Sequence, residues 1–147
     1  MSSGPWETAA NAMKARLDGW AALGDVIAIV DRQKDISSEV LNSIEKAKGI
    51  AISILFEGFR VPDENMAGPQ TRARYAVRVW GLPIIADADA DVMHAEDAAA
   101  ETAKALHFFR PSGAHSFGEC HVRDCDLVND PNFLCYELTV EVDIYLT

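Results

Sequence analysis

The chain has 147 residues, of which 49% are hydrophobic and 24% charged, and its formal net charge is −10. This length and composition fit one globular domain with its own core and exclude a wholly disordered chain. No apolar run approaches the ~20 residues that span a bilayer, so we expect no membrane contact. Three cysteines without paired spacing suit a reducing compartment, and the acidic balance excludes bulk attraction to nucleic-acid phosphates.

The N-terminal region predicts a short leader followed by an amphipathic helix. Residues 1–5 are expected to be a flexible leader, and one domain is expected to cover residues 6–147. Between Trp6 and Trp20, apolar residues recur at steps of three and four, which is the spacing of one helical stripe. Gly24 is the expected stop.

Two strands and a second helix are predicted next. The apolar run Val26–Val30 lacks polar alternation and predicts a strand buried on both sides. A short side-chain oxygen at Asp35 or Ser37 can cap a helix that ends at Gly49. The alternating segment Ile50–Phe56 then predicts a strand.

A long connection joins this strand to another one. The segment Gly58–Gln70 has no period and contains two glycines and two prolines, so we expect a loop between two antiparallel strands. The next strand is expected over Thr71–Trp80. Its two faces carry Ala73, Tyr75, Val77 and Val79 on one side, and Arg72, Arg74, Arg78 and Trp80 on the other.

The C-terminal half predicts one helix and a closing hairpin. An acidic run at Asp87–Asp91 leads into an alanine-rich helix over Val92–Phe109. A strand over Cys120–Val128 and a turn over Asn129–Asn132 follow. From Leu134 to Leu146 every second residue is apolar, which is the period of a strand with one buried face. This strand is longer than usual, and its exposed edge would need a cover, for which a neighbouring subunit is one candidate.

The order of these elements predicts the fold class. Adjacent strand pairs with helices between them indicate an α+β fold, with a mainly antiparallel sheet of about four to five strands and helices packed on one face.

A search for catalytic or metal-binding patterns gives little. The run Asp87–Asp91 opens like a calcium loop but lacks the glycine and the bidentate glutamate that follow in such loops. The cluster His115, Cys120, His121 and Cys125 has poor spacing for zinc. A cysteine nucleophile with a histidine base requires a pairing in space that sequence does not show. We therefore expect no catalytic residue, no cofactor and no metal.

The charges of two strands form complementary faces. Arg72, Arg74 and Arg78 share one face of one strand, and Glu137, Glu141 and Asp143 share one face of another. In the ordinary interpretation, these charges pair across neighbouring strands of one solvated sheet, for well under ~1 kcal/mol each. In the second interpretation, which we favour, they lie in a contact between subunits, and a head-to-tail contact of this kind generates a ring or a filament.

The order of elements resembles that of the tail terminator (tail completion) proteins of long-tailed bacteriophages, the minor tail protein U type. The resemblance spans most of the chain from Trp6 onward, and related head–tail connector proteins share much of the pattern. It rests on the N-terminal amphipathic helix leading into a short strand, the long connection between Ile50–Phe56 and Thr71–Trp80, the helix ending in His107-Phe108-Phe109-Arg110-Pro111, and the hairpin through Asn129-Asp130-Pro131 into Phe133–Val140.

The resemblance implies a structural virion protein without enzyme activity. Copies of the chain would form a homo-oligomeric ring, a hexamer, that caps the tail tube, ends its polymerisation and joins the tail to the head. The partners would be further copies of itself, the tail tube protein and the head–tail connector protein. DNA would pass through the ring without sequence-specific binding, and the negative charge suits such a conduit. The protein would be made in the bacterial cytoplasm and reside in the tail or neck of the virion.

The long connection is the first candidate for contact with the tube or the lumen, because irregular loops of over ~12 residues are uncommon and often functional. The candidate contact residues are Arg60, Asp63, Glu64, Asn65 and Met66.

Two other functions remain open. One is a head–tail adaptor or another component of the tail rings. The other, of a different class, is a small cytosolic enzyme that uses Cys120, Cys125 or Cys135 with His107, His115 or His121.

Overall fold

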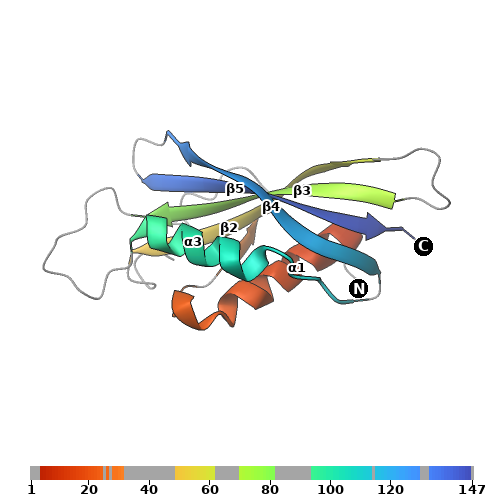
Figure 1. The fold of residues 1–147 in the computed structure, drawn as a ribbon, viewed down its shortest axis with the longest axis horizontal. Helices are drawn as coiled ribbons and strands as arrows, with labels where there is room; N and C mark the ends of the chain where they lie inside the picture. The colour runs from red at the N-terminus through yellow and green to blue at the C-terminus, as the bar shows by residue number, and fades with distance from the viewer. Residues whose placement is uncertain are drawn as a thin grey trace, which may run out of the picture.

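The alternating residues near the C-terminus form an inner strand of a five-stranded sheet (Figure 1). In this computed structural model, the described residues are 4–24, 26, 28–31, 49–61, 70–81, 94–113, 115–129 and 133–146. The elements are α1 (Pro5–Asp18), the 3-10 turn η1 (Ala21–Leu23), β1 (Ala28–Asp31), β2 (Ile50–Arg60), β3 (Gln70–Gly81), α3 (Ala95–Leu106), β4 (Ser116–Val128) and β5 (Leu134–Tyr145). The predicted α+β class is confirmed.

The strand order is β1-β2-β3-β5-β4, in which only β1 and β2 run parallel. β5 forms the predicted hairpin with β4, and its other edge pairs with β3 over the whole length from Gln70↔Tyr145 to Gly81↔Leu134. The expectation that this strand has an exposed edge is therefore wrong. Both of its edges are covered within the chain, so β5 itself needs no neighbouring subunit.

The core lies between one face of the sheet and the two helices α1 and α3. Figure 1 shows both helices on the same side of the sheet, and the residues that β3 and β5 present to them are the apolar ones that alternation predicts. Burying each large aliphatic side chain contributes roughly 1.5–3 kcal/mol. The core residues of these four elements are Ala9, Ala10, Met13 and Leu17; Ala73, Tyr75, Val77 and Val79; Ala95, Ala98, Ala99, Ala105 and Leu106; and Leu138, Val140, Val142 and Ile144.

α1 and α3 also contact each other through polar groups. Arg16 donates from Nε to the carbonyl oxygen of Ala105 at 3.1 Å, and the Trp20 indole donates to Glu101 Oε2 at 2.9 Å. The guanidinium of Arg16 lies over the ring of Trp20. The predicted helical stripe is thus correct for α1, although Trp20 itself follows the helix, which ends at Asp18.

Several element ends differ from the sequence prediction for local reasons. β2 does not end at Phe56 but continues to Arg60, because Gly58 adopts φ +125° and forms a bulge that keeps the strand paired. α3 ends at Leu106 because His107 is extended and Phe108 has φ +66°. This turn lets Phe108 donate to Cys120 O at 2.8 Å, while Cys120 donates to Phe109 O at 2.7 Å.

Some predictions fall on residues outside the described part of the chain. These are most of the leader, the second helix, the acidic run Asp87–Asp91, most of the hairpin turn, and Asp63, Glu64, Asn65 and Met66 of the long connection.

Candidate interaction surface

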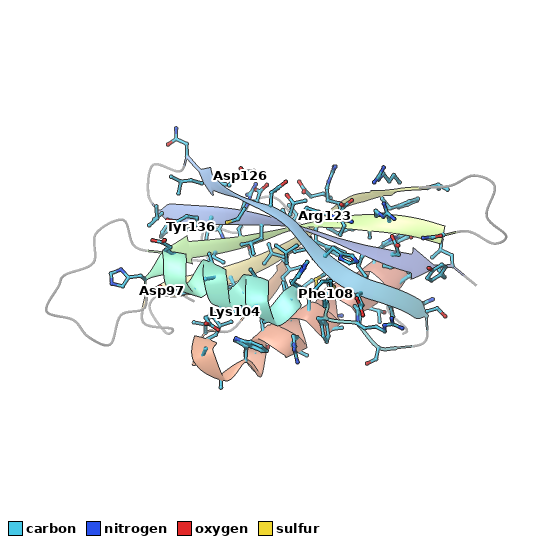
Figure 2. The ribbon with its side chains drawn as sticks, in the orientation of Figure 1. Asp97, Lys104, Phe108, Arg123, Asp126 and Tyr136 are labelled. Carbon is cyan, nitrogen blue, oxygen red and sulfur yellow. The ribbon has the colours of Figure 1, made fainter. Side chains whose placement is uncertain are left out.

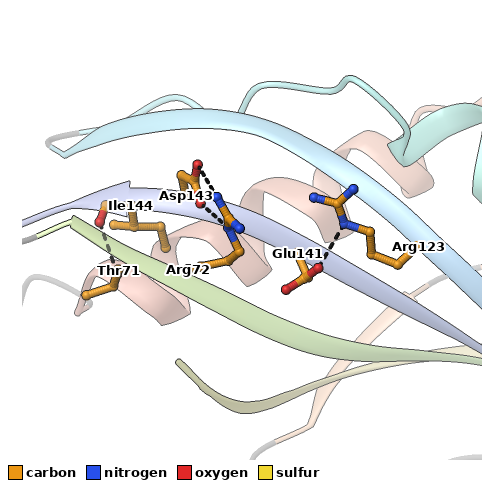
Figure 3. Close-up of polar contacts among 6 residues, drawn as sticks. All are labelled: Thr71, Arg72, Arg123, Glu141, Asp143 and Ile144. Atoms are coloured by element: carbon orange, nitrogen blue, oxygen red, sulfur yellow. Dashed lines mark hydrogen bonds and ion pairs between the residues drawn. The ribbon is translucent and has the colours of Figure 1, made fainter. Parts of the chain in front are cut away.

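The face of the sheet that the helices do not cover carries paired charges. In the β3–β5 register, Arg72 lies opposite Asp143 and Arg78 lies opposite Glu137. Arg72 Nε is 2.8 Å from Asp143 Oδ1 (Figure 3). Arg78 Nε is likewise 2.8 Å from Glu137 Oε2. These two pairs form inside the chain, as the ordinary interpretation expects.

Arg74 is the exception among the three predicted arginines. Its register partner is Glu141, but that carboxylate accepts a hydrogen bond from Arg123 Nε of β4 at 2.8 Å (Figures 2 and 3). Arg74 Nε is instead 3.7 Å from Glu57 Oε1 of β2, and its side chain is 57% exposed. The guanidinium group of Arg74 therefore keeps most of its capacity to donate hydrogen bonds to a further partner. A place for these arginines and carboxylates in a subunit interface stays a prediction.

These pairs orient the side chains more than they stabilise the fold. The hydrogen bond to Asp143 is the main cause that raises the pKa of Arg72. Partly exposed ion pairs contribute about 0.2–1 kcal/mol each, and salt screens them. Where an arginine has a short contact with a carboxylate, the pair keeps that part of the open face close to neutral.

One corner of this face has an excess of positive charge. Arg60, at the end of β2, lies opposite Arg72 in the β2–β3 register, and both line a shallow hollow of about 130 Å³ together with Arg74, Glu57 and Glu141. Asp143 neutralises Arg72 and Arg123 neutralises Glu141. Among the described residues, Arg60 makes no ion pair. Of the residues predicted for the contact loop, Arg60 is the one that the structure describes.

Aromatic rings extend the same corner on the helix side of the sheet. Trp6 of α1 stacks on Phe56 with ring centroids 5.6 Å apart and on Phe59 at 4.9 Å. Tyr75 donates from its hydroxyl to Trp6 O at 2.6 Å. The ring of Phe59 is still 49% exposed. The sequence predicts that Phe59 lies in a loop. In the structure, the strand continues past the bulge at Gly58, and the alternation of apolar residues gives no sign of this bulge.

The cysteines and histidines do not form an activated site in the described part of the chain. Cys120 faces the core, and its burial raises the pKa of the thiol to about 12. Burial also raises the pKa of Cys125, with a further contribution from the carboxylates of Asp126 and Asp124. Both shifts oppose thiolate formation, whereas a nucleophilic cysteine needs the pKa lowered.

Other polar groups of this cluster have structural contacts. His107 Nδ1 accepts the backbone N–H of Val122 at 3.1 Å, which covers part of the outer edge of β4. No three histidine, cysteine, aspartate or glutamate residues in the described ranges lie together as metal ligands. No helix among these residues is long and apolar enough to cross a membrane.

Comparisons with known proteins identify the fold and no family. No family model matches this chain, and no curated protein matches it. A solved structure whose title gives only a sequence identifier superposes with a TM-score of 0.61 at 16% identity, covering 99% of both chains. At that identity, the likeness shows the fold alone and carries no function.

Proposed function

We propose that the chain is a structural virion protein, a phage tail terminator that assembles into a homo-oligomeric ring, which we expect to be a hexamer. The ring would cap the tail tube, end its polymerisation and join the tail to the head connector. The order of the elements along the chain, which resembles that of tail terminators, supports this proposal.

The observation that carries the proposal is the sheet face that no described helix covers. It is lined by charged side chains, and at one corner Arg60 and Arg74 retain unused hydrogen-bonding capacity. Such a face suits repeated contacts with identical copies, because a contact between unlike patches repeats until a ring closes. The raised thiol pKa values of Cys120 and Cys125 give the alternative of a cysteine enzyme no support.

Native mass spectrometry and negative-stain imaging test the ring. We expect multiples of the 16.1 kDa chain and particles with a central hole. Added to growing tail tubes of the same phage, the protein should stop elongation. A monomer that neither forms rings at high concentration nor stops tube growth would contradict the proposal. A ring that does not act on tubes would favour the adaptor alternative.

Shortening the long connection tests its predicted role in tube contact. Deleting residues 63–66, which include Asp63 and Met66, should abolish capping while the far-ultraviolet circular dichroism spectrum stays that of the parent. Normal capping by the shortened protein would remove this segment from the contact surface.

A further inference from the structure

The excess positive corner combines charge with an apolar side chain. We define the arginine corner as Arg60, Arg74 and Phe59. Arg60 lies on the open face, opposite Arg72, and Phe59 lies on the helix side, opposite Ala73 and stacked on Trp6. Among the described residues, the carboxylate that pairs with Arg74 is that of Glu57, 3.7 Å from Nε, and this distance leaves room for a closer partner.

The far end of β4 presents the complementary features. We define the acidic edge as Asp124, Asp126 and Leu127. Asp126 lies opposite Glu137, and Asp124 lies opposite Thr139, so both are on the open face. Arg78 already holds Glu137, and within the described residues neither aspartate makes an ion pair. Leu127 lies on the helix side, opposite Tyr136, and is 65% exposed.

β4 is the last strand of the described sheet on this side, and beyond Val122 no described strand pairs with its outer edge. The carbonyl and N–H groups of such an edge are available to another chain. The two bulges of β4 distort this edge, and its acidic side chains repel negatively charged surfaces. Both features reduce nonspecific strand pairing. A partner for this edge must therefore bring positive charge.

The arginine corner and the acidic edge do not meet within the chain. Arg60 is level with Asp143 through its partner Arg72, whereas Asp126 is level with Glu137, six residues or about 20 Å away along β5. Arg74 and Asp124 are nearer, level with Glu141 and Thr139, but β5 lies between their strands and Arg74 contacts Glu57 instead. Figure 2 shows Asp126 at the end of β4 that points away from the β2–β3 hairpin end. Two unlike surfaces that do not meet within one chain can pair between molecules, in a head-to-tail contact.

We propose that the arginine corner of one subunit docks on the acidic edge of a second copy of this chain. Arg60 and Arg74 would face Asp124 and Asp126, and Phe59 would face Leu127. This inference rests on the proposed ring and deepens it. It assigns the carboxylates of the subunit interface to Asp124 and Asp126 of β4 and no longer to Glu141 of β5.

Charge reversal tests the pairing. The variant Arg60→Glu/Arg74→Glu and the variant Asp124→Arg/Asp126→Arg should each lose the oligomer in native mass spectrometry, and combining all four changes should restore it. The control Lys104→Glu/Arg110→Glu has the same charge change as the first variant on exposed cations elsewhere and should keep the oligomer.

The outcomes of these experiments distinguish a failure of the residue pairing from a failure of the proposed ring. An unchanged oligomer in either two-site variant, or loss without restoration in the combined variant, would overturn the pairing while the ring proposal stands. A parent protein that is monomeric at every concentration would overturn both.

A second measurement needs no variant. Cys125 lies opposite Leu138, on the same side of β4 as Leu127 of the acidic edge, and is the exposed cysteine of the three. Its reaction with a thiol reagent should be about tenfold or more slower in the assembled protein than in diluted monomer, because access controls thiol reactivity. Equal rates in the two states would overturn the inference.

Discussion

Each outward arginine of β3 is oriented by a carboxylate on a neighbouring strand, but the arginines differ in what they leave free. Arg72 and Arg78 are about two-thirds or more covered and have short contacts, whereas Arg74 is mostly exposed with a long one. A partly covered pair that is already formed gains little from a new partner. Single residues thus divide the open face into a structural part and a part available for binding.

The three cysteines provide a test at the scale of the residue. Cys125 should react with DTNB in the native monomer, whereas Cys120 and Cys135, which are buried, should react only after unfolding. At pH 8 the thiol of Cys120 stays protonated, because its pKa is raised to about 12. The variant Cys125→Ser should therefore show no native reaction. Rapid labelling of Cys120 in the folded protein would instead favour the enzyme alternative.

Among the elements, β5 has its register determined from both sides. Its partners β3 and β4 pair with it along almost its whole length, and a slip of one residue would turn every core residue to the charged face. The alternating pattern is thus enforced by two neighbours as well as by the helices.

Substitution at consecutive positions of β5 tests this arrangement. Val140, which is 0% exposed, lies opposite Tyr75 and Val122, so Val140→Asp should leave no cooperative unfolding transition, since an unpaired buried charge costs several kcal/mol. The control Thr139→Asp places the same charge on the open face, opposite Asp124, and should lower the unfolding midpoint only slightly. A soluble, folded Val140→Asp protein would contradict the assignment of the buried face.

Periodicity predicted the faces of β3 and β5 correctly, because side-chain direction along a strand is a local property. It could not predict which strands are neighbours, so the place of β5 between β3 and β4 was missed. Arg123 was missed as the partner of Glu141 because the bulge between Val122 and Asp124 disrupts the alternation of β4. Glu57 was likewise missed, because it lies at the bulge between Phe56 and Gly58, between the predicted strand and the predicted loop.

The whole molecule is acidic but unevenly charged. Its net charge of −10 should keep copies apart, so any self-association needs a local attraction that exceeds the general repulsion. The arginine corner and the acidic edge provide opposite charge at opposite corners of one sheet. Their attraction acts across solvent and is therefore sensitive to ionic strength.

Salt titration tests this property of the assembly. Between about 0.05 and 0.5 M NaCl, the oligomer should dissociate while the circular dichroism spectrum stays constant, because the Debye length falls well below ~10 Å. The contacts Arg72–Asp143 and Arg78–Glu137 are short and partly covered, so they should persist. An oligomer that strengthens with salt would indicate that apolar contacts dominate the interface.

The position of β5 between β3 and β4 also has a consequence for biosynthesis. β5 is made after every other described strand, yet it alone joins β4 to the rest of the sheet. Until the ribosome has produced it, β4 lacks its partner in the sheet, and the twelve-residue edge of β3 lacks its partner on that side. The register that places the arginine corner relative to the acidic edge is then not yet set. Incomplete chains would therefore be excluded from the assembly.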